Sequence, residues 1–288
     1  MLIQIDEHAG VCPGVLRAIT LAEKELEKGN KLVSVGPLIH NRFEIERLRA
    51  MGLQAFEQSI FETNTNWEKA LEGHKLLIRT HGISPCLRQK LLNVNFSLVD
   101  ATCPTVLRSQ KLVAEYSDQD YQIVIIGKPG HPEVIGLSGH AKGATYVITG
   151  LEDLEQIDCS QKTFVIAQTT IDINLFNKLR QLLKGRIPEI EVVNTVCGAM
   201  KARCHQLRGF VRSNELILFV GGHNSSNTTV LFNICRQENN NSFHIDHVDE
   251  IDRRWFNGCF RIGITGSAST PRWQLEDVRI YLEHFVKN

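Results

Sequence analysis

Short apolar runs separated by longer amphipathic segments recur along the 288-residue chain. Runs such as Gln122–Ile126 are typical of parallel strands that are covered on both faces. Segments such as Val15–Lys28 carry apolar residues at helical spacing and therefore predict helices between the strands. This alternation predicts an α/β fold with mainly parallel sheets.

The pattern gives approximate bounds for these elements. Strands are expected at Ile3–Ile5, Lys31–Val35, Lys75–Arg79, Phe96–Val99, Gln122–Ile126, Thr145–Thr149, Thr163–Ala167, Glu191–Val196, Glu215–Val220 and Arg261–Thr265. Helices are expected at Val15–Lys28, Phe43–Met51, Pro85–Leu92, Pro104–Tyr116, Asp172–Lys184, Thr229–Gln237 and Pro271–Val286, with another from Cys197 to Arg212. The asparagine-rich stretch Glu238–Ser242 is expected to form a surface turn.

Three cysteines at strand ends mark a long-range repeat. Cys103 follows Cys12 by 91 residues, and Cys197 follows Cys103 by 94. His40 lies 28 residues after Cys12, and His131 lies 28 residues after Cys103. Because a period of about 90 residues is longer than a solenoid repeat, we expect three small α/β domains in a pseudo-threefold arrangement. Their bounds are 1–96, 97–192 and 193–288.

Composition narrows the classes of partner and compartment. Lysine and arginine together equal aspartate and glutamate at 32 each, so nothing predicts binding to nucleic acid or to an anionic membrane. No apolar run approaches the roughly 20 residues of a membrane span, and the first residues do not resemble a signal peptide. We therefore expect a cytoplasmic protein whose eight cysteines are reduced.

Cys12, Cys103 and Cys197 suit an iron–sulfur cluster, because thiolates are the usual ligands of its irons. Three thiolates would leave one iron of a [4Fe-4S] cluster without a protein ligand and therefore open to substrate. By analogy, a catalytic zinc site is distinguished from a structural one by an open coordination position. Buried structural cysteines are the equally weighted alternative from spacing alone. The other five cysteines break the pattern and are interpreted as packing residues: Cys86, Cys159, Cys204, Cys235 and Cys259.

Polar loops at the remaining strand ends suggest binding of an anion. His40, His81 and His131 lie in such loops, and histidine can bind phosphate as a cation or exchange protons near neutral pH. The runs H-N-S-S-N-T and G-S-A-S-T-P offer hydroxyls and backbone N–H groups ahead of helices, although they could equally be helix caps. Glu133 could donate a proton if like charge and burial raise its pKa, or could be a solvated loop residue.

Eight loops carry recognisable motifs in this order: G-V-C-P-G-V-L-R-A-I at Cys12, H-N-R at His40, H-G at His81, D-A-T-C-P at Cys103, G-H-P-E-V at His131, Q-T-T at Thr169, N-S-S-N at Asn227 and A-S-T-P at Ser269. Together they resemble the 4-hydroxy-3-methylbut-2-enyl diphosphate reductase family. The resemblance covers nearly the whole chain. It implies the last step of the methylerythritol phosphate route to isoprenoids.

The resemblance also implies roles for individual residues. Cys12, Cys103 and Cys197 would hold a [4Fe-4S] cluster at the centre of a three-domain trefoil, with the substrate hydroxyl on the open iron. Glu133, with Thr169 and His131, would serve proton delivery, and ferredoxin or flavodoxin would supply single electrons. Isopentenyl and dimethylallyl diphosphate would be the products. The expected diphosphate-binding residues are His40, His81, His131, Thr169, Ser225, Ser226, Asn227 and Ser269.

The chain departs from the family pattern mainly after the third cysteine. Met200 and Cys204 stand where the family usually has threonine and glutamine, Val11 replaces phenylalanine, and His223 replaces lysine. These departures leave two alternatives open. One is a divergent paralogue that acts on another anionic substrate, and the other is a non-catalytic iron–sulfur sensor.

Overall fold

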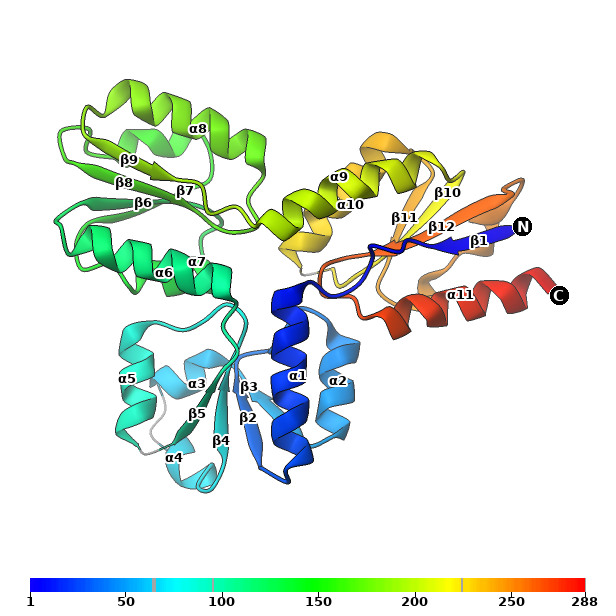
Figure 1. Cartoon of the computed structure of the whole chain (residues 1–288), viewed down its shortest axis with the longest axis horizontal. Helices are drawn as coiled ribbons and strands as arrows, with labels where there is room; N and C mark the ends of the chain where they lie inside the picture. The colour runs from blue at the N-terminus through cyan, green and yellow to red at the C-terminus, as the bar shows by residue number, and fades with distance from the viewer. Residues whose placement is uncertain (64–65, 95, 224, 288) are drawn as a thin grey trace. The chain divides into compact units, whose positions relative to one another are not determined.

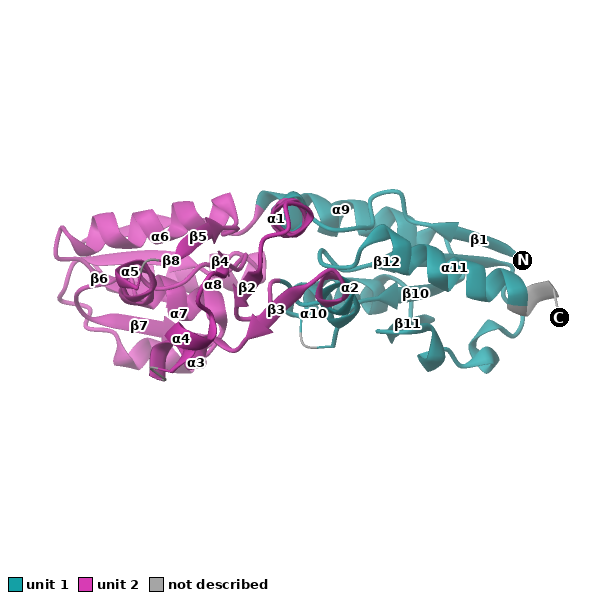
Figure 2. Cartoon of the chain, turned by 90° about the horizontal axis from the view of Figure 1, so that it is seen from below, with its two compact units in different colours: residues 1–16, 39–47, 198–288 teal, residues 17–38, 48–197 magenta. Residues whose placement is uncertain are grey.

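In the computed structural model, the described residues are 1–63, 66–94, 96–223 and 225–287. Asn224, in the H-N-S-S-N run, therefore lies outside the described residues. The chain divides into two compact units (Figure 2). Unit 1 comprises residues 1–16, 39–47 and 198–288, and unit 2 comprises residues 17–38 and 48–197. Within the described ranges, no helix is both long and apolar enough to cross a bilayer.

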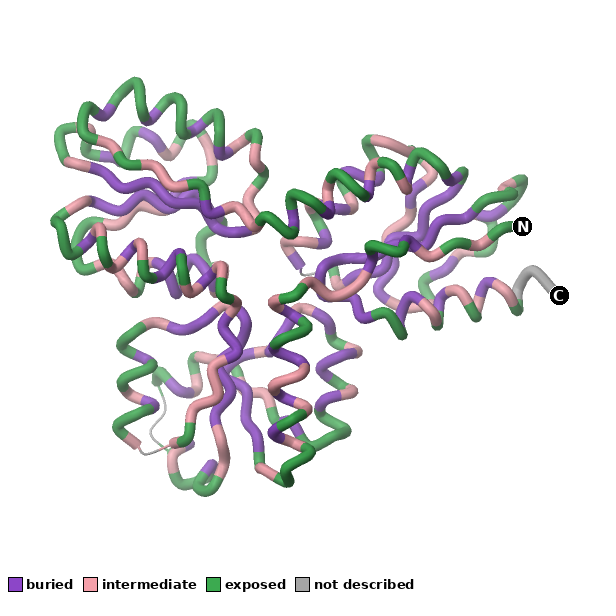
Figure 3. The backbone as a smooth tube through the Cα atoms, in the orientation of Figure 1, coloured by how far each residue is buried: buried purple, intermediate pink, exposed green. Residues whose placement is uncertain are grey.

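The described strands form three four-stranded sheets in which every pairing is parallel (Figure 1). The expected α/β class with parallel sheets is therefore confirmed. The central strands Gln122–Ile126, Thr163–Ala167 and Leu216–Val220 are mostly apolar and are buried along their whole length, whereas the helices keep an exposed face (Figure 3). Burial on both faces explains why these strands lack polar alternation.

Unit 1 holds the sheet with strand order β1-β12-β10-β11. Its strands are β1 (Leu2–Ile5), β10 (Leu216–Val220), β11 (Ser242–Ile245) and β12 (Arg261–Gly266). Helices α9 (Gly198–Arg212) and α10 (Ser226–Glu238) cover one face, and α11 (Arg272–Lys287) covers the other (Figure 1). Leu275, Val278 and Leu282 of α11 pack on Leu218 and Ile264 of the sheet. Two short 3-10 helices, η2 (Val248–Glu250) and η3 (Arg253–Phe256), follow β11.

Unit 2 holds the sheet with order β3-β2-β4-β5. Its strands are β2 (Leu32–Val35), β3 (Leu53–Phe56), β4 (Lys75–Ile78) and β5 (Ser97–Asp100). The accompanying helices are α1 (Pro13–Glu27), α2 (Arg42–Ala50), α3 (Gln58–Thr63), α4 (Trp67–Ala70) and α5 (Pro85–Asn93), of which α1 and α2 begin in unit 1. One face of this sheet packs Val35 and Ile78 against Phe61, Trp67 and Leu91.

Unit 2 also holds the sheet with order β7-β6-β8-β9. Its strands are β6 (Gln122–Ile126), β7 (Thr145–Ile148), β8 (Thr163–Ala167) and β9 (Ile190–Val193). The helical elements are α6 (Pro104–Ser117), α7 (Pro132–Ser138), α8 (Ile173–Arg186) and the 3-10 helix η1 (Glu152–Gln156). Helix α8 packs on one face, and α6 and α7 pack on the other (Figure 1).

Strand pairing crosses the expected module boundaries. β1 joins β12 at the far end of the chain, and β5 joins β4 rather than β6. The β3-β2-β4-β5 sheet is therefore completed by the strand that begins the second expected module, and the β1-β12-β10-β11 sheet by the first strand of the chain. The division into modules 1–96, 97–192 and 193–288 stays a prediction. It was drawn from hydrophobic runs, which locate strands along the chain but do not show which strands pair.

Two local expectations were wrong. Helix α10 begins at Ser226 rather than near Thr229, because the Ser225 hydroxyl accepts a hydrogen bond from the Thr228 N–H and caps the helix. The expected surface turn at Glu238–Ser242 ends in a strand, since Ser242 pairs with Ile217 at the start of β11.

Candidate active site

The three candidate cysteine ligands occupy equivalent places in the three sheets. Each follows an edge strand at its carboxyl end: Cys12 follows β1, Cys103 follows β5 and Cys197 follows β9. Each also donates its backbone N–H to a carbonyl in the loop after the neighbouring strand. The acceptors are Ala268 for Cys12 (2.9 Å), Thr80 for Cys103 (2.9 Å) and Thr169 for Cys197 (2.8 Å). One local architecture therefore presents all three thiols.

Each of the three cysteines lies at the start of a helix. Cys103 is the N-cap of α6, Cys12 directly precedes α1, and Cys197 directly precedes α9. The N-terminus of a helix carries a partial positive charge and unpaired backbone N–H groups that attract a bound anion. All three cysteines are half-buried and free of disulfides, so their chemistry fits the thiolate ligands of an iron–sulfur cluster.

Glu133 is the buried acid of unit 2. It lies in the first turn of α7, and only 1% of its surface is exposed. Its Oε1 accepts from the Thr169 N–H at 2.7 Å, and its Oε2 accepts from the Thr169 hydroxyl at 2.8 Å. Burial raises the pKa of Glu133 to about 7, even though both hydrogen bonds favour the ionised form. This carboxyl can therefore exchange a proton near neutral pH.

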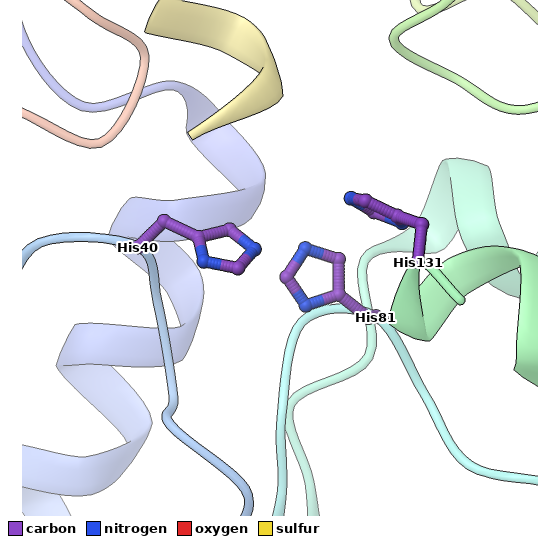
Figure 4. Close-up of side chains that lie close together, drawn as sticks. All are labelled: His40, His81 and His131. Atoms are coloured by element: carbon purple, nitrogen blue, oxygen red, sulfur yellow. The ribbon is translucent and has the colours of Figure 1, made fainter. Parts of the chain in front are cut away.

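Two of the candidate histidines lie side by side in unit 2. The ring centroids of His81 and His131 are 5.3 Å apart, and the rings are perpendicular (Figure 4). His131 is the N-cap of α7, where its Nδ1 accepts from the Glu133 N–H at 3.2 Å. Because Nδ1 accepts, a neutral His131 ring carries its proton on Nε2.

Thr169 connects the acid to one of the candidate ligands. Its N–H and hydroxyl serve Glu133, whereas its carbonyl accepts the Cys197 N–H. Unit 2 therefore brings together four predicted site residues, His81, His131, Glu133 and Thr169, with Cys197 one hydrogen bond away from Thr169.

A buried amide and a hydroxyl that were not expected from the sequence hold this loop. Gln168 is buried, accepts from the Lys128 N–H at 2.9 Å and donates to the Thr170 hydroxyl at 2.9 Å, so it joins the loops after β6 and β8. The Thr195 hydroxyl donates to the Ala167 carbonyl at 2.6 Å and fixes the chain that leads to Cys197. The feature of the sequence that could have indicated these two residues is their position just after an apolar strand.

The turn before Cys103 has its own supports. Arg17 donates to the carbonyls of Asp100 and Thr102 at 3.1 and 3.3 Å, and Arg88 pairs with the Asp100 carboxylate at 2.7 Å. Hydrogen bonds from Thr102 and Arg88 outweigh the desolvation of Asp100 and lower its pKa. The D-A-T-C turn is thereby held by charged side chains of α1 and α5.

Unit 1 gathers the predicted anion-binding residues of the last third of the chain. Ser225 caps α10, and Ser226 and Asn227 lie in its first turn. Ser269 lies in the loop after β12, where its hydroxyl contacts that of Ser267 at 3.0 Å and donates to the His40 carbonyl at 3.1 Å. His40, Ser225, Ser226, Asn227 and Ser269 therefore belong to the same unit as Cys12.

The remaining cysteines differ in burial. Cys235 is fully buried, and desolvation raises the pKa of its thiol to about 12, which fits a packing residue. Cys159, Cys204 and Cys259 are half-buried. The packing interpretation of Cys86 is wrong, because that side chain is exposed on α5.

The fold and the site define an α/β protein that presents one cysteine and adjoining polar loops from each of three parallel sheets. The model of the LytB protein family matches residues 3–283. The chain therefore belongs to the LytB protein family.

Curated relatives and solved structures match over almost the full length. Proteins named 4-hydroxy-3-methylbut-2-enyl diphosphate reductase are 40% identical in Bacteroides fragilis (99% of this chain, 98% of the relative) and 34% identical in Aquifex aeolicus (99% and 97%). A structure of (E)-4-hydroxy-3-methyl-but-2-enyl diphosphate reductase, described as the terminal enzyme of the non-mevalonate pathway, is 32% identical with a TM-score of 0.75 (99% and 100%). A diphosphate reductase structure from Plasmodium falciparum is 26% identical with a TM-score of 0.85 (98% and 87%).

Proposed function

We propose that the chain reduces (E)-4-hydroxy-3-methylbut-2-enyl diphosphate to isopentenyl and dimethylallyl diphosphate. The reaction breaks the carbon–oxygen bond of the allylic alcohol, consumes two electrons and two protons, and releases water. Relatives that carry the name of this reductase match 99% of the chain and support the proposal. The observation that carries it is the buried Glu133–Thr169 pair, because Thr169 joins a protonatable carboxyl to the Cys197 turn.

Cys12, Cys103 and Cys197 would hold a [4Fe-4S] cluster as thiolates. Their shared position at helix starts supports this assignment. When bound, the cluster would supply single electrons and an open iron for the substrate hydroxyl. The electrons would come from ferredoxin or flavodoxin, which deliver them one at a time.

Glu133 would supply a proton at the reacting end of the substrate. With a pKa of about 7 the carboxyl is partly protonated at neutral pH, so it can give up a proton and regain it between turnovers. The Thr169 hydroxyl and N–H would hold the resulting carboxylate in place. His131, bonded to the Glu133 N–H, fixes the start of the helix that carries the acid.

The diphosphate would be bound by hydroxyls, imidazoles and a helix N-terminus. Ser225, Ser226 and Asn227 occupy the start of α10, where backbone N–H groups favour an anion. Ser269 and His40 belong to the same unit, and His81 and His131 supply imidazoles from unit 2. Imidazole N–H groups and hydroxyls together can donate hydrogen bonds to phosphate oxygens and orient them.

The test is turnover by the reconstituted protein. We expect anaerobically loaded protein to hold about four irons per chain and to release water from the allylic diphosphate when a strong one-electron donor is added. Glu133→Gln should lower kcat by about 10²–10⁴-fold, because the amide cannot donate the proton. Glu155→Gln, a matched change at an exposed residue of η1, should leave kcat unchanged.

Other outcomes would contradict the proposal. A loaded protein that turns over none of this substrate but converts another anion would be the divergent paralogue. A protein whose cluster controls binding of a partner without turnover would be the sensor. Equal activity of Glu133→Gln and the wild type would remove Glu133 from proton delivery.

A further inference from the structure

His40 lies in a short segment that belongs to unit 1, although the residues on either side of the segment belong to unit 2. Residues 39–47 belong to unit 1, whereas the flanking residues 17–38 and 48–197 belong to unit 2. The segment therefore leaves the sheet of β2 and is held by residues that come much later in the sequence. What holds it determines where His40 lies among the predicted anion-binding residues.

Two buried amides fasten the segment next to His40. The Asn41 Nδ2 donates to the Gln274 Oε1 at 2.9 Å, and the Gln274 Nε2 donates to the Asp246 carbonyl at 2.7 Å. The Asn41 Oδ1 accepts from the Glu44 N–H at 2.9 Å and caps the start of α2. Asn41 is 2% exposed and Gln274 is 4% exposed. We call Asn41 and Gln274 the amide clasp.

The donors and acceptors of these hydrogen bonds allow only one orientation of the Gln274 amide. If the Gln274 amide were turned over, its oxygen would face the Asp246 carbonyl and its N–H₂ would face the Asn41 N–H₂. Both contacts would then be repulsive, and the buried groups would lose their partners. Leaving a buried polar group unsatisfied is costly, so the clasp specifies one arrangement.

The clasp places the His40 backbone against two predicted diphosphate loops. The Ser269 hydroxyl donates to the His40 carbonyl at 3.1 Å. Gly222, just before the Ser225–Asn227 turn, approaches the same carbonyl so closely that an added Cβ would lie 3.1 Å from it. The residue next to the clasp thus touches both loops through its main chain.

Three other polar and ring contacts of the segment each include a side chain that is more exposed than the two amides. Arg42 pairs with Asp246 at 2.8 Å, but its side chain is 59% exposed. The Trp273 Nε1 donates to Glu44 at 2.9 Å, and Phe43 stacks on His247 with ring centroids 4.9 Å apart. Solvent weakens an exposed ion pair of this kind, so the buried amides are the more specific attachment.

We propose that Asn41 and Gln274 are positioning residues that hold His40 beside Ser269 and the start of α10, so that these groups act as one diphosphate-binding half-site. The inference rests on the proposed function, because it takes the diphosphate as the ligand of these loops. Neither amide touches the ligand; the clasp acts through His40. It lowers the cost of binding by fixing His40 before the ligand arrives.

The first test separates KM from kcat in the reconstituted holoenzyme. Gln274→Met removes both hydrogen bonds at nearly constant volume, and Asn41→Asp removes the donor to Gln274 while keeping the acceptor that caps α2. Each should raise KM for the allylic diphosphate about tenfold and change kcat less than about threefold. Asn214→Asp, a matched change at a buried amide before β10, should leave both constants unchanged. A fall in kcat with KM unchanged would overturn the proposal.

The second test is a double-mutant cycle with His40→Ala. If the clasp acts through His40, Gln274→Met should raise KM no further once the imidazole is gone. A merely structural amide would raise KM by the same factor in both backgrounds, and that result would overturn the proposal. Folding of each variant is followed by circular dichroism. If Gln274→Met does not fold, Asn41→Asp takes its place in the cycle with His40→Ala.

Calorimetry with inorganic diphosphate separates failure of the clasp from failure of the proposed function. Wild-type protein that binds inorganic diphosphate without turning over the allylic substrate would contradict the proposed reaction, while the affinity cycle would still test the clasp. Binding of inorganic diphosphate that is equally tight in the wild type, Gln274→Met and Asn41→Asp would overturn the clasp. Wild-type protein that binds neither ligand would overturn both.

Discussion

The Glu133 carboxyl is held in a place that favours its neutral form. It is almost completely buried, and its two hydrogen bonds both come from Thr169. Because two hydrogen bonds do not offset the loss of water, the pKa rises to about 7. The side chain that we propose as the proton donor is therefore also one that destabilises the fold when it is ionised.

Glu133→Gln should stabilise the protein at alkaline pH. The folded state holds the Glu133 proton up to about pH 7, whereas the unfolded state releases it near 4.5. The wild type binds more protons when folded in this range, so its free energy of unfolding falls as pH rises from 4.5 to 7. We expect the variant to be more stable at pH 8 by at most about 3 kcal/mol, with the gain lost at pH 4.5.

Urea unfolding at the two pH values measures this difference. The Gln side chain can still accept from the Thr169 N–H and donate to its hydroxyl, so the hydrogen bonds of the loop are kept. A gain in stability of equal size at pH 4.5 and pH 8 would show that ionisation of Glu133 is not its cause.

At the scale of elements, helix α9 is tied to the unit 1 sheet by a buried ion pair. Arg203 of α9 lies 2.7 Å from the Asp6 carboxylate, which follows β1, and Asp6 also accepts from the Thr265 hydroxyl at 2.9 Å. The side chains of Arg203 and Asp6 are 10% and 2% exposed. Since Cys197 directly precedes α9 and Cys12 follows Asp6, this pair lies within a few residues of two candidate ligands in the sequence.

Asp6→Asn should be strongly destabilising. The change leaves the buried Arg203 charge without a counterion, which costs about 3–5 kcal/mol in comparable sites. The double variant Asp6→Asn with Arg203→Met should recover most of the loss, because it removes the unpaired charge. Asp252→Asn, which breaks the exposed pair with Arg254, should cost less than about 1 kcal/mol. Urea unfolding of the three variants measures these costs, and similar values for Asp6→Asn and Asp252→Asn would contradict the argument.

The sequence predicts most strands, most helices and the residues at strand ends, but not the contacts that join distant segments. Apolar runs locate β6, β8 and β10, and small polar turns locate Cys103, His131 and Thr169. Nothing in a run of apolar residues shows that β1 pairs with β12, or that Asn41 meets Gln274, 233 residues away. Such partners depend on the packing of helices between strands. β3 and β11 were not expected from the sequence: each has only four residues, and β11 carries a serine and a histidine.

At the scale of the whole molecule, three sheets repeat one plan. In each, two central strands end in polar loops, and an edge strand ends in a cysteine whose N–H bonds to the loop beside it. Unit 1 contains one such cysteine together with His40, Ser225 and Ser269, and unit 2 contains two such cysteines together with Glu133 and Thr169. Under the proposed function, Ser225 and Ser269 of unit 1 would bind the anion, whereas Glu133 of unit 2 would supply the proton.

Replacing any one of the three cysteines should therefore have the same effect. Cys12→Ser, Cys103→Ser and Cys197→Ser each remove one thiolate, and a serine hydroxyl is a poor substitute for the soft sulfur ligand. We expect each variant to lose most of its iron and labile sulfide after anaerobic reconstitution, with the visible absorption of the cluster falling in proportion. Cys204→Ser, at a half-buried position two turns into α9, is the matched control and should keep its iron. If the Cys204 variant lost as much iron as the others, or if one of the three kept it all, the equivalence of the three turns would not extend to cluster binding.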